Sequence, residues 1–404
     1  MKFTATKTDL VKALTVLAKV LPKRAVQPVL SNVLIDIDSY HTSSMTAIAT
    51  DLDNTLRLIV PILSVEEIGT VSLDAKHVLS ALKTLPKTAE VVTIEHDSIL
   101  SSDNFFGSIT FRSGSSSFTS KTIAASDFPD MLVVKDKAAT TLSSSELCTI
   151  CEKVAFSASQ IDTNSVLDGV SFRQYEGAGL EVAASDRSRL TAYTPVRPVA
   201  DKSFDFILPV ASVKLLAQLS KFNDKKYSPA YVSVGTEEFS GKVTFSTPKG
   251  CLTSNLIKGE YPRYTELFPT DLGGYRILEK VGLLSACEAV IAKKEDHTNA
   301  LTIVGLEVGS TDGEFRSSLN GCSSNPMPIS LNANYLKQWI TANDCTEVKI
   351  KVNDDKILSP VLLEGHQGDI RHLIMPVYQT TRFDQSTSKH VLKEGWWMKY
   401  QLSN

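Results

Sequence analysis

The chain has 404 residues, of which 42% are hydrophobic and 22% charged, and its formal net charge at pH 7 is −3. These proportions are typical of packed globular proteins and exclude a disordered chain, and the length suits two or three domains of about 100–200 residues each. The sequence has no run of about 18 apolar residues, and its opening, MKFTATKTDL, lacks the apolar segment of a signal peptide. We therefore expect an intracellular, cytoplasmic protein with no membrane partner.

Amphipathic helices separated by short strands are the first predicted elements. Residues 7–21 predict a helix that begins after Thr6, with Asp9 three residues further on. Ser143 and Glu146 form a fuller capping-box pattern and predict the start of another helix. Between the helices, alternating segments such as GSITFRSG, YVSVGTEEF and KVTFST predict antiparallel strands. The predicted class is α+β, with helices on one face of antiparallel sheet.

Three segments of the chain repeat one pattern. The pairs Thr50-Asp51 and Ser185-Asp186 both follow strand-like runs, and they lie 135 residues apart. A second pattern, a short strand leading into a helix, occurs three times: VSLDAKHVLSALKTLP, FILPVASVKLLAQLSK and ISLNANYLKQWITAN. Because these periods exceed the roughly 20–50 residues of solenoid repeats, each copy is predicted to be a domain with its own core. The predicted boundaries are 1–130, 139–263 and 265–379, with an extension at 380–404 outside the pattern.

Positive charge is concentrated in the predicted helices despite the negative total. Residues 7–24, 76–87 and 210–226 carry net charges of +4, +3 and +3. A helix-lined basic surface can contact the phosphates of a nucleic acid without reading its bases. The alternative is that these lysines only solvate helix faces. The candidate DNA-facing residues are Lys19, Lys23, Arg24, Lys76, Lys83, Lys214 and Lys221.

Motifs of the common enzyme classes are missing from the sequence. It has no GxxxxGK[ST], HExxH, GxSxG or EF-hand pattern, and its seven histidines are scattered without ligand spacing. The six cysteines are sparse and predict reduced thiols; the one CxxC, Cys148 and Cys151, lies in a predicted helix and is interpreted as two small half-buried residues. We expect a protein with no catalytic residue, no metal and no cofactor.

Six motifs occur in an order that resembles one known family. MKFT, ATDLDNTL, SDFPDM, ASDRSRL, EYPRYTELFP and LIMPV run from residue 1 to about residue 379, and they are similar to those of the beta subunit of bacterial DNA polymerase III, the sliding clamp. The resemblance implies the DNA clamp fold, in which two three-domain subunits close a head-to-tail dimeric ring around duplex DNA, with helices inward and sheets outward. It implies a processivity factor, associated with the nucleoid, that tethers the replicative polymerase.

The resemblance also implies a pocket that binds short peptides, with Gln and Leu anchors, from the polymerase, the clamp loader and repair proteins. The middle domain would supply Leu167, Ser185, Arg189 and Leu190, with Pro262 and Leu267 beside the next junction. The third domain would supply Asn332, Tyr335, Leu358, Pro360, Ile374, Met375, Pro376 and Val377. The dimer interface is expected at an edge strand near Phe118 and a helix near Ile291.

Departures from the family pattern modify these expectations. Arg187-Ser188 stands where family members often have Gly-His, which predicts an altered peptide preference. The middle domain lacks aromatic and basic pairs that some relatives use near DNA, so contact through Lys23 and Arg24 is the firmer expectation. The segment DHTNALTIVGLEVGSTDG predicts a shortened hairpin.

Two alternatives stay open from the sequence. A sequence-independent DNA-binding scaffold that forms no ring would share the basic helices. Beyond residue 379 a Ser/Thr-rich stretch precedes HVLKEGWWMKYQLSN, with Trp396, Trp397, Tyr400 and Leu402. This extension is interpreted as disordered or packing on itself, or its YQLSN end occupies the peptide pocket.

Overall fold

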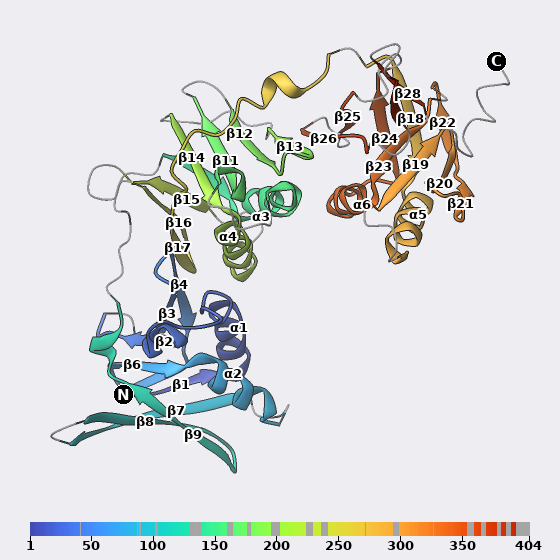
Figure 1. The fold of residues 1–404 in the computed structure, drawn as a ribbon. Coiled ribbons are helices and arrows are strands. Elements are labelled where there is room, and N and C mark those ends of the chain that lie inside the picture. The colour runs from blue at the N-terminus through green and yellow to red at the C-terminus, as the bar shows by residue number, and fades with distance from the viewer. Residues whose placement is uncertain are drawn as a thin grey trace. The chain divides into compact units, whose positions relative to one another are not determined.

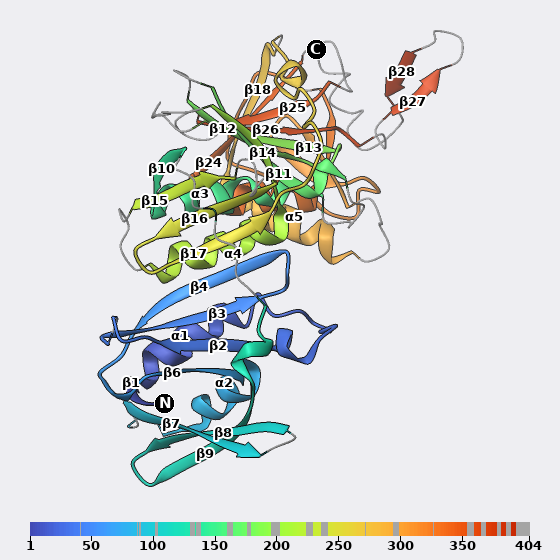
Figure 2. The ribbon, with the colours of Figure 1, turned by 90° about the vertical axis from the view of Figure 1, so that its left-hand side faces the viewer.

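The computed structural model contains two compact units, each described by itself. Figures 1 and 2 show the helices and strands along the chain. The first unit comprises Met1–Cys151, Val199–Phe204 and Leu208–Lys258, and the second comprises Glu152–Pro198, Asp205–Ile207 and Gly259–Asn404. The residues that the structure describes are 1–40, 42–86, 88, 90–101, 104–129, 134, 139–159, 165–175, 179–194, 203–223, 229–235, 241–270, 272–293, 299–325, 327–353, 359–364, 369–377, 381–384 and 389–392.

An antiparallel sheet of 13 strands forms the first unit. It includes strands from the first and the second predicted domains, because β17 pairs with β4 and places Leu252 opposite Leu56. The sheet therefore continues across the predicted boundary. Its strands, in spatial order, are β10 (Thr140–Ser143), β15 (Pro229–Val234), β16 (Lys242–Thr247), β17 (Gly250–Asn255), β4 (Asn54–Pro61), β3 (Ser44–Thr50), β2 (Asn32–Ile37), β6 (Gly69–Asp74), β9 (Ser116–Ile123), β8 (Asn104–Ser113), β7 (Val91–Ser101), β1 (Lys2–Thr6) and β5 (Ser64–Glu67).

Helices α1 (Lys7–Leu17), α2 (Ala75–Thr84) and α4 (Val210–Phe222) of this unit lie beside one another, with α1 in contact with both others. Helix α1 begins as predicted, since the Thr6 hydroxyl accepts the Asp9 N–H at 3.0 Å. It ends at Leu17 rather than residue 21, with Ala18 as its C-cap, whose N–H donates to the Leu14 carbonyl at 2.9 Å. Helix α3 (Ser144–Lys153) has the predicted capping box, in which the Glu146 carboxylate accepts the Ser143 N–H at 2.7 Å.

Two further antiparallel sheets form the second unit. In the larger one, β13 pairs with β26 and joins the second predicted domain to the third. Its strands are β14 (Phe204–Pro209), β11 (Gly169–Gln174), β12 (Leu180–Ser185), β13 (Arg189–Tyr193), β26 (Ile370–Ile374), β25 (Val361–Glu364), β24 (Glu347–Val352), β18 (Gly274–Glu279) and β22 (Gly321–Ser323). The smaller one contains β21 (Arg316–Ser318), β20 (Glu307–Ser310), β19 (Ala300–Val304) and β23 (Ile329–Asn332).

Helices α5 (Lys280–Ala292) and α6 (Ala333–Ala342) pack on each other and on these strands. Trp339 of α6 is fully buried in the core between them, together with Leu283 and Leu336. The segment predicted to be compressed forms the tight β19–β20 hairpin, connected by Gly305 and Leu306. Single-turn 3-10 helices occur at η1 (Pro28–Ser31), η2 (Ala125–Asp127), η3 (Ala155–Ser157), η4 (Val166–Asp168) and η6 (Thr265–Leu267).

The C-terminal extension contributes a two-stranded hairpin of β27 (Thr381–Asp384) and β28 (Lys389–Leu392). Its aromatic residues, Trp396, Trp397 and Tyr400, and its YQLSN end lie outside the described residues, so self-occupation of the pocket stays a prediction. None of the helices in the described part of the chain has the length and apolar character needed to cross a bilayer.

Candidate functional site

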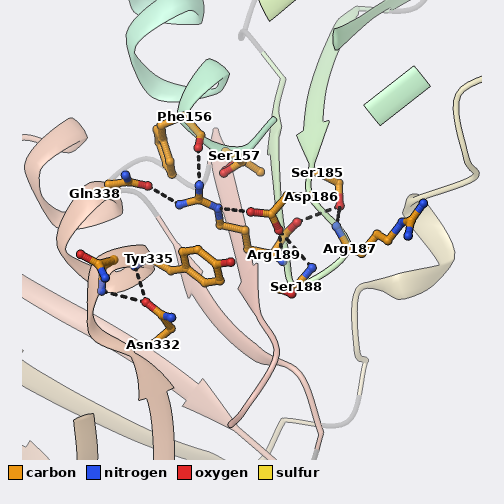
Figure 3. A network of polar contacts seen from close by, with 12 residues as sticks. Phe156, Ser157, Ser185, Asp186, Arg187, Ser188, Arg189, Asn332, Tyr335 and Gln338 are labelled. Carbon is orange, nitrogen blue, oxygen red and sulfur yellow. Dashed lines mark hydrogen bonds and ion pairs between the residues drawn. The ribbon is translucent and has the colours of Figure 1, made fainter. Parts of the chain in front are cut away.

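A four-residue turn between β12 and β13 begins at the second of the repeated pairs, Ser185-Asp186 (Figure 3). The Ser185 hydroxyl donates to the Arg189 carbonyl at 2.8 Å and accepts the Arg187 N–H at 3.2 Å. The Asp186 carboxylate accepts the N–H groups of Ser188 and Arg189, both at 3.0 Å. These bonds hold Arg187 at φ 77°, in the left-handed region.

The first copy of the motif forms the same turn between β3 and β4. The Thr50 hydroxyl donates to the Asn54 carbonyl at 2.9 Å and accepts the Leu52 N–H at 3.1 Å. Asp51 accepts the next two N–H groups, and Leu52 also has φ 77°. The repeated sequence therefore has a structural cause. A hydroxyl and a carboxylate at consecutive positions form hydrogen bonds with the backbone N–H and carbonyl groups of a short turn.

Arg189, the first residue of β13, connects the turn to the third repeat. The residue is almost fully buried, at 5% exposure. The guanidinium donates to Asp186 at 2.9 Å, to the Phe156 carbonyl at 2.6 Å and to the Gln338 side chain, and it lies 4.2 Å from the Tyr335 ring centroid. Figure 3 shows these groups converging on it from the turn, η3 and α6. The guanidinium faces inward, so Arg189 positions the site's walls rather than offering its charge to a ligand.

Asn54 occupies the equivalent position in the first unit, with a neutral amide in place of the guanidinium. Its side-chain oxygen accepts the Ser212 hydroxyl at 2.6 Å, and Ser254 donates to the same hydroxyl at 2.8 Å. Asn255 also donates to Asp53 at 3.0 Å. Like Arg189 with Asp186, Asn54 also donates to the aspartate of its turn, Asp51, at 3.3 Å. The same joint between repeats thus uses a neutral amide in one place and a buried guanidinium in the other.

His372 of β26 belongs to a row of buried polar side chains that are hydrogen-bonded to one another. Its Nδ1 shares a hydrogen bond with the Thr191 hydroxyl at 2.7 Å, and that hydroxyl shares another with Ser157 at 2.5 Å. Burial, with the nearby charge of Arg189, lowers the pKa of His372 to about 3. Because Ser157, Thr191 and His372 are all fully buried, this row cannot meet a substrate and works as a structural connection.

The structure brings several predicted pocket residues together where β13 pairs with β26. Arg189 lies opposite Ile374, Leu190 lies opposite Leu373, and the Met375 N–H donates to the Ser188 carbonyl at 2.9 Å. Met375 and Leu267 present large apolar side chains, at 42% and 56% exposure. Of the other predicted residues, Pro262 is exposed, Leu190, Ile374 and Pro376 are buried, Leu167, Ser185, Asn332, Tyr335, Pro360 and Val377 are half-buried, and Leu358 lies outside the described residues.

Two residues of the site were missed from the sequence. Gln338 and the Phe156 carbonyl both bind the Arg189 guanidinium. The available signal for Gln338 was its position three residues after Tyr335, on the same face of α6. Asn332 has a local role as well, because its side chain caps α6 by accepting the Asn334 N–H at 2.9 Å.

The predicted DNA-facing residues are all exposed, and all belong to the first unit. They lie on α2 and α4, or in the segment that follows α1. Some lysines of both units have partners within the protein: Lys19 donates to Gln218 at 2.5 Å, Lys337 pairs with Glu288 at 2.9 Å, and Lys280 donates to the Asn343 carbonyl at 2.8 Å. The predicted residues are Lys19, Lys23, Arg24, Lys76, Lys83, Lys214 and Lys221.

An open strand edge lies at the predicted interface residue Phe118. Strand β9 pairs with β8 along its length, but β6 pairs only with Thr122 and Ile123 of it. Over residues 116–121 the other edge of β9 has no strand partner within the described chain. Phe118 is half-buried and stacks on Phe111 with 4.7 Å between ring centroids, whereas Ile291 packs partly against the core of the second unit.

Comparison with known proteins places this geometry in a family. Models of the DNA polymerase III beta subunit match residues 1–132 with its N-terminal domain and residues 141–263 with its central domain. The beta sliding clamp of Synechococcus elongatus is 26% identical over 391 residues, covering 93% of this chain and 99% of the relative. That of Haemophilus influenzae is 26% identical over 388 residues, covering 93% and 100%.

Solved structures of DNA polymerase III beta subunits and sliding clamps share the fold. The beta subunit of Thermotoga maritima has a TM-score of 0.79 at 19% identity, covering 93% of this chain and 99% of that one. The sliding clamp of Bacillus subtilis has a TM-score of 0.78 at 22% identity, with the same coverage. With the two family models together matching more than half of its length, the chain belongs to the DNA polymerase III beta subunit, or beta sliding clamp, family.

Proposed function

We propose that this protein is a non-catalytic DNA sliding clamp, a processivity factor that encircles duplex DNA and tethers the replicative polymerase. The observation that carries the proposal is a strand pairing between successive repeats, here called a joint, which occurs twice. The strands that could form a third joint lie in the third repeat and in the first repeat. In each joint, the strand after the repeated turn pairs with the last strand of the next repeat: β4 with β17, and β13 with β26.

The third repeat supplies the first half of another joint. Its turn is two residues longer and closes when the Ser310 N–H donates to the Phe315 carbonyl at 3.0 Å, in place of the bond from the Asp186 N–H to the Arg189 carbonyl at 3.2 Å. The strand that follows, β21, is an edge strand of its sheet. Strand β9 is the counterpart of β17 and β26 and has the open edge. Pairing β21 of one subunit with β9 of another is head-to-tail, and two such contacts close a ring of two subunits.

The first joint also predicts the register of this contact. Asn54 lies opposite Ser254, four residues after the start of β17. Transferring that register to β9 and β21 places Phe315 opposite Ser120 of the partner subunit, Arg316 opposite its Thr119 and Ser317 opposite its Phe118. The third joint would thus be built around the residue that the family resemblance indicates.

Cysteine cross-linking tests the ring and its register. The exposed pair Arg316→Cys with Thr119→Cys, in a Cys322→Ser background, should oxidise to a covalent dimer with both interfaces closed. A control pair, Arg316→Cys with Ser120→Cys, should not, since a shift of one residue places the side chains on opposite faces of the sheet. A protein that is monomeric at micromolar concentration and gives no cross-link would support the alternative, a DNA-binding scaffold without a ring.

The basic helix layer of the first unit supports sequence-independent contact with duplex DNA. Exposed basic residues after α1 and on α2 and α4 neutralise phosphates without reading bases, so the contacts exchange easily as the protein moves along DNA. After loading by a clamp loader onto a nicked circular duplex, the complex should survive high salt, which weakens phosphate contacts but not a closed ring. Cutting the circle should then release it. Retention on linear DNA would contradict topological binding.

The joint of β13 with β26 supports a peptide site for the polymerase, the clamp loader and repair proteins. Exposed apolar side chains, Met375 and Leu267, lie in the same unit as half-buried polar groups on Asn332 and Ser185, a combination that suits an extended peptide with Gln and Leu anchors. The Thr50 turn of the first unit is proposed to be structural. Replacing Met375 with Asp should weaken binding of an anchored peptide without changing the stability of the subunit.

The domain boundaries 1–130, 139–263 and 265–379 belong to this proposal as units of the repeat. Sheets that continue across two of the joints explain why the two compact units of the structure do not coincide with them. Association with the nucleoid would follow from DNA binding.

A further inference from the structure

We infer that Arg187 is a specificity-determining residue that selects partner peptides carrying a carboxylate beside their anchors. The inference rests on the proposed peptide site and adds the charge of the ligand to it.

The backbone at Arg187 holds its side chain outward. Of the described residues other than glycine, only Leu52, Arg187 and Asn299 have a positive φ. A side chain in the left-handed region is disfavoured relative to glycine, so a large charged residue at this point of the turn is retained against a local cost. The matching Leu52, 57% exposed, shows that the turn itself requires no charge there.

The Arg187 guanidinium has no hydrogen-bond or ion-pair partner among the described residues, where its backbone N–H alone is bonded, to Ser185. Neighbouring charges of the turn are already satisfied. Both oxygens of Asp186 accept bonds from within the turn, and the Arg189 guanidinium is turned inward. Figure 3 shows the exposed Arg187 side chain pointing away from this network. Its charge is therefore available to a ligand.

Apolar surface lies close to this charge. The residue after Arg187, Ser188, accepts the Met375 N–H through its carbonyl, and Met375 is half exposed. The segment that carries the exposed Leu267 is fixed to β12 through the Tyr264 hydroxyl, which donates to Glu181 at 3.1 Å. A peptide whose anchor covers Met375 thus passes within reach of the guanidinium.

A carboxylate is the ligand group that fits. A guanidinium binds carboxylates through two parallel hydrogen bonds. The charged side chains of residues 260–267, the segment that carries Leu267, are the exposed Arg263, Glu260 and Glu266. Neither glutamate pairs with Arg187. Since the guanidinium is exposed, the expected gain in affinity is about two- to fivefold, and it should fall as salt rises.

The test measures binding of labelled synthetic peptides by fluorescence anisotropy. Each peptide has Gln and Leu anchors, and a single Asp, Asn or Lys is placed in turn at each other position. The full-length protein is compared with Arg187→Gln and with Leu52→Gln, a control at the same place in the equivalent turn. At one position Asp should bind about two- to fivefold more tightly than Asn, the difference should vanish in Arg187→Gln, and Leu52→Gln should behave as wild type.

The outcomes separate this inference from the proposed function. If anchored peptides bind but the ratio of Asp to Asn affinities is the same in Arg187→Gln at every position, Arg187 does not select charge, while the peptide site stands. If anchored peptides bind no better than a peptide without anchors, the peptide site itself is refuted and the inference falls with it.

Discussion

Replacing Arg189 with Met tests whether the buried guanidinium holds the second unit together at the joint of β13 and β26. Met keeps much of the aliphatic volume but removes the donors to Asp186, Phe156 and Gln338. The Arg189 side chain is 4% exposed and that of Asp186 is 16% exposed. Breaking such a buried pair by removing one partner costs about 3–5 kcal/mol, and two backbone N–H donors to Asp186 remain, which favours the lower end.

A second arginine in the same unit is a matched control. Arg173 pairs with Asp205 at 2.8 Å, but the Asp205 side chain is 47% exposed. Surface pairs of this kind contribute about 0.2–1 kcal/mol. Arg173→Met should therefore shift the unfolding midpoint in urea much less than Arg189→Met does.

Urea unfolding is the assay, followed by circular dichroism and by tryptophan fluorescence, to which the buried Trp339 contributes. In Arg189→Met the transition that reports on Trp339 should move to lower urea, and anchored peptides should bind more weakly because the turn and α6 are no longer held together. Equal midpoints for the two variants would refute the reasoning, since they would show that the buried network contributes no more than a surface pair.

Three further predictions concern other parts of the molecule. Burial favours the neutral ring of His372 and lowers its pKa in the folded state to about 3, from an ordinary value of about 6.5. The contribution of His372 to the free energy of unfolding is therefore fully present above pH 6.5 and falls by about 4 kcal/mol by pH 3.5. Urea unfolding at a series of pH values should show this pH dependence in the wild type and not in His372→Gln. At Gly250 an added Cβ would lie 2.1 Å from a carbonyl oxygen of β4, so Gly250→Ala should lower the melting temperature of the first unit far more than Gly114→Ala, where nothing lies within 4 Å. Replacing Lys23 and Arg24 with Ala should reduce the salt slope of DNA binding by about two phosphate contacts in a filter-binding titration, and an unchanged slope would exclude them from the contact surface.

Local structure could be predicted well because its causes are local. The cap at Thr6, the capping box at Ser143 and the alternating strands depend on residues only a few positions apart. The repeat of Thr50-Asp51 at Ser185-Asp186 indicated equivalent structure, and the two turns share the same hydrogen bonds. A pattern within reach of four residues contains all the information that such a turn needs.

Long-range partners could not be predicted in the same way. Nothing near Arg189 in sequence identifies Gln338, 149 residues away, or the Phe156 carbonyl as its partners. The family resemblance placed Arg189 in the pocket but did not show that its guanidinium faces inward. Pairing of β17 with β4 was likewise invisible, because a strand's alternation shows which face is buried but not which strand lies beside it.

The two joints differ in a way that connects structure to the proposed function. In the first joint the Asn54 amide bonds Ser212 and the Asp51 carboxylate, and Ser254 bonds Ser212, so the joint itself does not require a buried guanidinium. Burying the pair of Asp186 and Arg189 carries a desolvation cost that neutral side chains avoid. What the charge adds is geometry: one planar guanidinium fixes the turn, η3 and α6 at once. That rigidity is useful where Arg187 and Met375 must meet a ligand together, and it is not needed at Leu52.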